Sequence, residues 1–153
     1  MPLPDDTHGR GRAPIVPSCI YGPAVKLEVR NEMNRVVHFE IPADDPEKAV
    51  AFYERAFGWK VEKWDGPQEY WMVNTGEQGV PGIGGAIMRK YDNRGTVNTI
   101  DVDSVDAAVQ KIEAAGGKVT APKMVVPGIG YMAYCTDTEG NVFGIMQMDE
   151  TVK

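Results

Sequence analysis

Two side chains capable of proton or metal chemistry, His38 and Glu40, stand two residues apart in the stretch VVHFEI. The alternation of apolar and polar residues there predicts a β-strand, on which both polar side chains point to the same face. A histidine beside a carboxylate can exchange a proton near neutral pH, and an imidazole can also ligate a divalent metal ion. Three interpretations remain open: a catalytic or substrate-contacting pair, a metal site at His38, and a hydrogen-bonded polar pair that lines a cavity.

The elements that must position this pair occur twice along the chain. The order strand, helix, strand, strand, strand starts near residue 36 and starts again near residue 96. A shift of 59 residues superposes the two series and brings Ile41 onto Ile100. One series covers only one face of its sheet with a helix, so a single copy buries too little surface to be stable. The repeat predicts an α+β fold of two tandem βαβββ units, whose curved mixed sheet encloses a cleft and carries the helices outside.

Both predicted helices carry signals at their ends. Asp45 precedes the first helix and can accept hydrogen bonds from its free N–H groups, and Gly58 suits a left-handed C-terminal stop. Ser104 and Gly116 stand at the corresponding ends of the second helix. The first helix has apolar residues at helical spacing, which predicts a face packed on the sheet: Ala49, Phe52, Tyr53 and Ala56.

Length and composition are typical of a globular protein with a single folded domain. The chain has 153 residues, of which 42% are hydrophobic and 25% are charged. Its first 33 residues are rich in proline and glycine and show little periodicity, so we expect an N-terminal extension over residues 1–33 that is flexible or laid over the surface. We expect the domain over residues 34–149, with units of about 34–90 and 95–149.

The charge balance is acidic, with a formal net charge of −6. This balance argues against binding to nucleic acid or to an anionic membrane surface, and it favours a neutral or cationic ligand. No apolar run is long enough to span a bilayer, and the N-terminus has no recognisable secretory signal, so we expect a cytoplasmic protein. Two cysteines, Cys19 and Cys135, form neither a disulfide framework nor a zinc site.

Three motifs of the chain resemble those of the vicinal oxygen chelate superfamily, which includes glyoxalase I, bleomycin-resistance proteins, extradiol dioxygenases and methylmalonyl-CoA epimerase. They are HFEIPADDPEKAVAFYERAFGWKV, DVDSVDAAVQKIEAAGGKV and GYMAYCTDTEGNVFGIMQ. The resemblance covers about residues 34–149. It implies paired βαβββ units, a homodimer, and a ligand site built from both units.

The resemblance also implies where a divalent metal ion would be held. Metal-dependent relatives use the ion to chelate two neighbouring oxygens of the substrate, with ligands from the first and last strand of each unit. Three of the four matching positions here offer no donor atom, so we assign no cofactor, and a divalent metal at His38 stays open. The four positions are His38, Gly85, Val97 and Gly144.

Strand alternation assigns further side chains to the same cleft. Asp101 shares the parity of Val97 and Thr99 and is an additional acidic candidate. Methionine and aromatic side chains adapt to varied apolar shapes, which suits a permissive pocket, and they equally well fill a sheet interior. The predicted ligand-contacting residues are Trp71, Thr99, Asp101, Met132, Tyr134 and Met146.

Two functions remain compatible with the sequence. In the first, the protein is a lyase or isomerase of glyoxalase type that acts on a small molecule, with His38 and Glu40 as its catalytic residues. In the second, it is a non-catalytic protein that binds a drug or metabolite without a metal. The missing metal ligands and the acidic balance favour the second, because an acidic cleft attracts a cationic ligand, whereas the first is the commoner function among the relatives that the resemblance names. Both functions imply a small-molecule partner.

Overall fold

The computed structural model describes residues 34–153, and the expected extension over residues 1–33 lies outside the described residues. No helix in this part of the chain is long and apolar enough to cross a membrane. The first unit consists of β1 (Val36–Ala43), α1 (Pro46–Phe57), β2 (Lys60–Lys63), β3 (Tyr70–Asn74) and β4 (Gly84–Arg89). The second unit consists of β5 (Val97–Asp101), α2 (Val105–Ala114), β6 (Lys118–Val126), β7 (Gly130–Thr136) and β8 (Val142–Met148).

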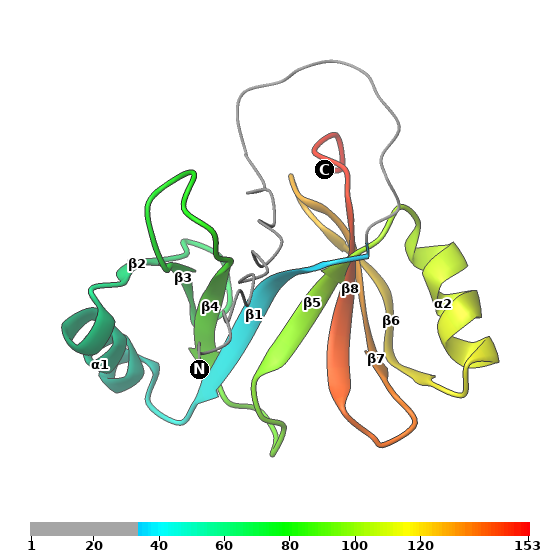
Figure 1. Cartoon of the computed structure of the whole chain (residues 1–153), viewed down its shortest axis with the longest axis horizontal. Helices are drawn as coiled ribbons and strands as arrows, with labels where there is room; N and C mark the ends of the chain where they lie inside the picture. The colour runs from blue at the N-terminus through cyan, green and yellow to red at the C-terminus, as the bar shows by residue number, and fades with distance from the viewer. Residues whose placement is uncertain (1–33) are drawn as a thin grey trace, which may run out of the picture.

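All eight strands belong to one mixed sheet in the order β2-β3-β4-β1-β5-β8-β7-β6. Each unit forms one half of the sheet, and the halves meet where β1 pairs antiparallel with β5 (Figure 1). Within each half the first strand pairs in parallel with the last, β1 with β4 and β5 with β8. The α+β fold of tandem βαβββ units is therefore confirmed, and the first strands of both units lie at its centre.

The pairing of β1 with β5 follows the internal repeat. His38 stands opposite Thr99, and Glu40 stands opposite Val97. Exchanging the two strands converts one pair into the other, because His38 and Val97, like Glu40 and Thr99, are 59 residues apart in the sequence. An approximate twofold relation therefore passes through the centre of the sheet, between these four residues.

The two helices cover the same face of the sheet, each over its own half. Phe39 packs in the cluster under α1, and Phe143 packs in the cluster under α2. Both are in register with Asn98, which places them on one face. His38, Glu40 and Thr99 alternate with these residues and point to the opposite face, which we call the helix-free face.

The packed side of α1 differs from the expected side at two residues, because Phe52 and Ala56 are both exposed. Ala49, Val50 and Tyr53 pack against the buried cluster of the first unit. Phe52, which we expected on this face, is 56% exposed, and its ring contacts Tyr53 and Phe57 along the outside of the helix. The aromatic residues of α1 therefore extend from the core to the surface as one group.

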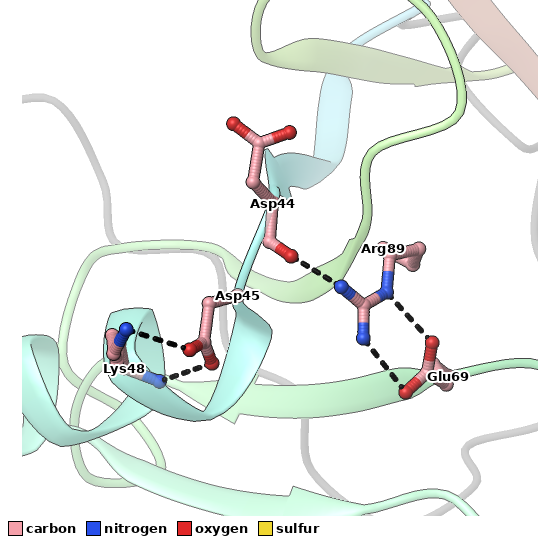
Figure 2. Close-up of polar contacts among 5 residues, drawn as sticks. All are labelled: Asp44, Asp45, Lys48, Glu69 and Arg89. Atoms are coloured by element: carbon pink, nitrogen blue, oxygen red, sulfur yellow. Dashed lines mark hydrogen bonds and ion pairs between the residues drawn. The ribbon is translucent and has the colours of Figure 1, made fainter.

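Contacts at the end of β1 fix the start of α1 (Figure 2). The Asp45 carboxylate caps the helix, since it accepts from the backbone N–H of Lys48 at 3.2 Å and lies 3.1 Å from Lys48 Nζ. Arg89, at the end of β4, donates to both carboxylate oxygens of Glu69 at 2.7 and 3.1 Å and also to the Asp44 carbonyl. These ion pairs are exposed, so each contributes at most about 1 kcal/mol, and the cap contributes about as much.

Replacing Asp45 by alanine is expected to lower the free energy of unfolding by about 1 kcal/mol, because the first turn of α1 loses its side-chain acceptor. Asparagine keeps an acceptor oxygen without the charge, so Asp45→Asn is the matched control and is expected to retain most of the stability. Urea denaturation measures both values. An equal loss in the two variants would assign the effect to the ion pair with Lys48 and contradict the capping role.

Candidate functional site

A hydrogen-bonded cluster on the helix-free face joins the two halves of the sheet. Glu40 of β1 accepts from Tyr70 of β3, with 3.2 Å between Oη and Oε1, and from Tyr134 of β7, with 2.9 Å between Oη and Oε2. The Nε2 atom of His38 lies 2.8 Å from Tyr70 Oη. We call these four residues the Glu40 cluster. His38 and Glu40 are thus linked to each other through a tyrosine that the strand order brings beside them.

The two tyrosines of the Glu40 cluster act as hydrogen-bond donors. Burial raises the pKa of both hydroxyl groups well above its usual range, and the neighbouring Glu40 carboxylate raises it further. Both phenols therefore stay protonated near neutral pH, and each donates its proton to Glu40. Glu40 is 7% exposed, and each of its oxygens accepts one of these bonds. The arrangement fits an ionised carboxylate, which is an acceptor on both oxygens.

His38 enters this network as a neutral imidazole. Burial lowers its pKa from the ordinary value of 6.5, and the attraction of Glu40 offsets this only in part. The proton of Tyr70 is directed to Glu40, so the contact between His38 and Tyr70 requires a proton on Nε2 of the imidazole. In this tautomer Nδ1 is the basic nitrogen. Two consecutive hydrogen bonds then run from Nε2–H to Tyr70 and from the Tyr70 hydroxyl to Glu40.

The lowered pKa of His38 makes the stability of the fold depend on pH. Between the folded-state pKa and 6.5, the unfolded chain binds this proton more strongly than the folded chain, so stability is complete above pH 6.5 and falls as the pH falls through this window. His38→Gln is expected to flatten the dependence between about pH 5 and 7, whereas His8→Gln, the change at the second histidine of the chain, is expected to preserve it. Denaturation series across this range measure the slopes. Equal slopes in the wild type and His38→Gln would contradict the assignment.

A cation from the connection between β4 and β5 lies beside the cluster. The guanidinium carbon of Arg94 is 5.7 Å from the centre of the Tyr134 ring, within the range of a cation–π contact. Asp92 orients it, with 2.6 Å between Oδ2 and Arg94 Nε. Hydrogen bonding to Asp92 is the main cause of the raised pKa of Arg94, and the charge of Glu40 adds to it. The link between the units thus supplies the Glu40 cluster with a positive neighbour.

Thr99 is a second buried polar residue on the same face. It is 2% exposed, and its hydroxyl has no hydrogen-bond partner among the described residues. Gly144 lies next to it in the sheet, and a Cβ atom there would be 2.8 Å from Thr99 Oγ1 and 3.0 Å from the methyl carbon of Met132. The space that a longer side chain at residue 144 would need is therefore occupied by Thr99 and Met132.

The strand register corrects one of the expected metal-ligand positions. Glu40 pairs with Ala86, and Thr99 pairs with Gly144, so the residue of β4 equivalent to Gly144 is Ala86 and not Gly85. Gly85 faces the helices, since a Cβ atom there would lie 2.4 Å from the ring of Phe39. The second unit is one residue shorter between its helix and its last strand, and a shift of 59 residues without a gap therefore misplaces this position by one.

The donor set at these positions does not fit a divalent metal ion. Ala86, Val97 and Gly144 carry no donor atom, which leaves only His38 from the expected set. Glu40 is nearby, but both its oxygens already accept from tyrosine hydroxyls. Within residues 34–153 no group of three or more His, Cys, Asp or Glu side chains is arranged to hold a metal. Three or four ligands are the usual minimum for a protein metal site, so two donors are too few.

The structure brings several of the predicted ligand-contacting residues together. Tyr134 belongs to the Glu40 cluster, and Thr99 is paired with His38 across the strands. Met132 and Met146 pair with each other across β7 and β8, and Asp101 is in register with Met146. These five residues share the helix-free face of the second unit.

Trp71 does not lie with them, and its expected orientation is wrong. It is 6% exposed and belongs to the buried cluster under α1, on the opposite face. The stretch EYWMVNT contains two interleaved sets of apolar residues, and the sequence pattern alone does not decide which set faces the helix. The structure directs Trp71 and Val73 to the helix, so Tyr70 faces the other way and enters the Glu40 cluster. Arg94 was also missed, because its loop has no periodic pattern.

Two hollows of the molecular surface lie away from the Glu40 cluster. One of about 340 Å³ lies on the helix face between α2 and the sheet, and its lining includes Ile100, Lys111 and Phe143. A smaller one of about 240 Å³ lies near the C-terminal end of α2 and includes Gly117 and Thr136. Both are shallow openings beside the core of the second unit, so neither is part of the Glu40 cluster, which has the polar groups needed for chemistry.

Sequence comparison identifies the family. The sequence model of the Glyoxalase/Bleomycin resistance protein/Dioxygenase superfamily matches residues 35–145, which include the first unit, the second unit as far as the middle of β8, and the whole Glu40 cluster. The chain belongs to this superfamily. Proteins from Mycobacterium bovis and Mycobacterium tuberculosis that carry the name glyoxylase CFP32 are 30% identical to this chain over 119 residues. The match covers 76% of this chain and 45% of each relative, so the chain spans about half the length of these relatives.

Solved structures share the superfamily fold at low sequence identity. A hypothetical protein from Bacillus halodurans has a TM-score of 0.59 and 15% identity, with 80% of this chain and 99% of that chain covered. Methylmalonyl-CoA epimerase from Mycobacterium tuberculosis has a TM-score of 0.56 and 13% identity, with 79% and 91% covered. A Streptomyces coelicolor methylmalonyl-CoA epimerase in complex with 2-nitronate-propionyl-CoA has a TM-score of 0.55 and 16% identity, with 73% and 95% covered. At these identities the likeness concerns the fold alone.

Proposed function

We propose that this superfamily member is a lyase or isomerase that moves a proton on a small molecule, using His38 and Glu40 without a divalent metal ion. The observation that carries the proposal is the chain of hydrogen bonds from His38 through Tyr70 to Glu40 on the helix-free face. The resemblance of the motifs also implies that a small molecule binds on this face, between the two units. The homodimer and the cytoplasmic location expected from the sequence belong to this proposal as well.

In the proposed reaction His38 is the general base. Its Nδ1 atom removes a proton from a carbon next to a carbonyl group, and the electron pair of the broken C–H bond moves into that carbonyl. The imidazolium formed still donates its Nε2–H to the Tyr70 oxygen, and Tyr70 donates its own O–H to Glu40, so the carboxylate stabilises the new positive charge through the phenol. The enolate electron pair then takes the proton back at the same carbon on its other face, or at the far carbon of a conjugated double bond, which completes an isomerisation, or it expels a leaving group from the next carbon, which completes an elimination.

A second candidate function is binding without turnover. It is favoured by the burial of Glu40 and by the pairing of both its oxygens, which are features of a carboxylate that serves a fixed structural or recognition role. In that case His38 and Glu40 orient a ligand and transfer no proton. The two functions differ in whether bonds to carbon break, which can be measured directly.

Deuterium incorporation separates the two functions. The full chain is incubated in D₂O with a panel of 2-oxo acids, hemithioacetals and acyl-CoA thioesters, in the presence of a chelator, and each compound is examined by NMR. The proposal expects catalysed exchange at one carbon of at least one compound, unaffected by the chelator and lost in His38→Gln. Binding without exchange favours the second candidate, and exchange that needs an added divalent ion contradicts the metal-free mechanism.

A further inference from the structure

We infer that the site on the helix-free face takes a ligand with a cationic nitrogen, an ammonium or guanidinium group, which is seated against Glu40, Tyr70 and Tyr134. This inference rests on the proposed small-molecule site and specifies the chemical class of its ligand. The charge at the centre of the sheet has the opposite sign to the one that the resemblance implies for metal-dependent relatives. In metal-dependent relatives the resemblance implies a divalent cation between the central strands, whereas here the central strands hold the carboxylate of Glu40 and no set of metal ligands.

The negative charge of Glu40 lies next to the positions at which metal ligands are expected. Glu40 stands between Ala86 of β4 and Val97 of β5, two of the four positions at which the resemblance places metal ligands. A fixed negative charge there disfavours an anionic ligand group at the place where a metal ion would attract one. The same charge attracts a positively charged group, and burial strengthens the attraction because little water screens it.

The aromatic groups around Glu40 suit a cation as well. Tyr70 and Tyr134 donate to opposite oxygens of the carboxylate, so their rings stand on either side of it. Trp64 adds a third ring, with 6.2 Å between its centre and that of Tyr70. A cation placed among these rings is attracted by their electron-rich faces and, in addition, by the negative charge of the Glu40 carboxylate.

One of these rings already binds a cation of the protein. The guanidinium carbon of Arg94 lies 5.7 Å from the centre of the Tyr134 ring, on which a cation is favoured. A positive group of the protein thus already occupies a place next to the Glu40 cluster. A ligand cation that reaches Tyr134 competes with Arg94, which remains paired with Asp92 when it is displaced. Arg94 therefore weakens the binding of a cationic ligand and does not supply its anchor.

A hydrogen-bond acceptor without a partner lies on the same face. The buried hydroxyl of Thr99 has no partner among residues 34–153, and a buried hydroxyl left in this state destabilises the fold until a ligand or water pairs with it. Glu40 retains further lone pairs beyond the two used by the tyrosines. An ammonium group brings three N–H donors and no acceptor, which matches a site with acceptors to fill.

Three probes with the same aromatic body test the charge preference: phenethylammonium, 2-phenylethanol and phenylacetate. Each is titrated into the full chain labelled with ¹³C at the methionine methyl groups, and the Met132 signal, assigned with Met132→Leu, reports binding on the helix-free face. We expect phenethylammonium to bind about tenfold more tightly than the alcohol, and phenylacetate to bind more weakly than either.

Variants assign the preference to Glu40. Glu40→Gln is expected to bring the ammonium and the alcohol to within about twofold of each other. Glu69→Gln removes an exposed carboxylate that is paired with Arg89, and it is expected to keep the wild-type preference. Arg94→Gln provides a second test in case Glu40→Gln does not fold, because Arg94 is exposed to solvent and its replacement leaves the core unchanged. We expect Arg94→Gln to bind phenethylammonium about threefold more tightly than the wild type, or tighter still.

The outcomes separate this inference from the proposed function. If the alcohol or phenylacetate moves the Met132 signal at concentrations as low as phenethylammonium does, the cationic ligand is wrong and the small-molecule site stands. If Arg94→Gln weakens the ammonium probe, the role given to Arg94 is wrong and so is the inference. If none of the three probes moves the signal at millimolar concentration, both the cationic ligand and the site fail.

Discussion

The double substitution Tyr70→Phe/Tyr134→Phe is expected to lower the free energy of unfolding at pH 7 by about 2–5 kcal/mol. It removes both hydroxyl donors from Glu40 and leaves a buried carboxylate without hydrogen bonds from the protein, while the aromatic packing is unchanged. A hydrogen bond to a charged group contributes about 1.5–3 kcal/mol, so each single substitution is expected to cost about that much. Denaturant titration of the three variants measures these values.

Tyr131→Phe is the matched control for this experiment. It removes the same oxygen from the same strand as Tyr134, but the Tyr131 hydroxyl makes no hydrogen bond within the described residues, and its ring packs at the edge of the cluster under α2. We expect a change within about 0.5 kcal/mol. If the double variant unfolds at the same denaturant concentration as this control, the two tyrosines do not hold Glu40 and the account of the cluster is wrong.

Replacing His38 by glutamine is expected to lower kcat by about 10²–10⁴-fold on any compound that the wild type turns over, because the general base is lost while a polar side chain of similar reach remains. The wild-type kcat/KM is expected to fall on the acidic side below pH 6.5, since burial lowers the pKa of His38 and only the neutral imidazole accepts a proton. Steady-state rates across pH 5 to 8 measure both effects.

Tyr70→Phe separates the base from the residue that positions it. This variant keeps the imidazole and removes the link to Glu40, so we expect a loss in kcat of about tenfold, much smaller than in His38→Gln, together with a displaced acidic limb of the pH profile. Wild-type activity in His38→Gln would exclude His38 as the base. Equal losses in both variants, with no displacement of the limb, would show only that the site had been disrupted.

The fold could be predicted from the sequence because its signals, such as helix caps, each involve a few neighbouring residues and occur in both units. Asp45 and Ser104 cap the two helices as expected, and Gly58 ends α1 in the left-handed conformation with φ of 69°. Each signal depends on a few neighbouring residues, and the repeat tests each of them a second time in the other unit. Cys135 is buried in the second cluster, as its apolar strand indicates.

The site was open to prediction only in part, because it joins residues from distant strands. His38 and Glu40 were found from their spacing on one strand, whereas Tyr70 and Arg94 required the sheet order and the course of a loop. The single-residue difference between the units then displaced one position, from Ala86 to Gly85. Alternation along a strand identifies two faces without saying which of them meets the helix, and for Trp71 that choice decides between core and site.

This superfamily member holds a neutral histidine and a tyrosine-bound carboxylate where metal-dependent relatives, according to the resemblance, hold a metal ion. The chain has two histidines, so His8→Ala leaves His38 as the one imidazole visible in a long-range ¹H–¹⁵N spectrum. We predict a neutral imidazole protonated on Nε2 at pH 7, with signals that do not change when one equivalent of Zn²⁺ or Ni²⁺ is added. A shift or broadening of these signals at one equivalent of metal, abolished by Glu40→Gln, would show that the pair ligates a metal and would contradict the account.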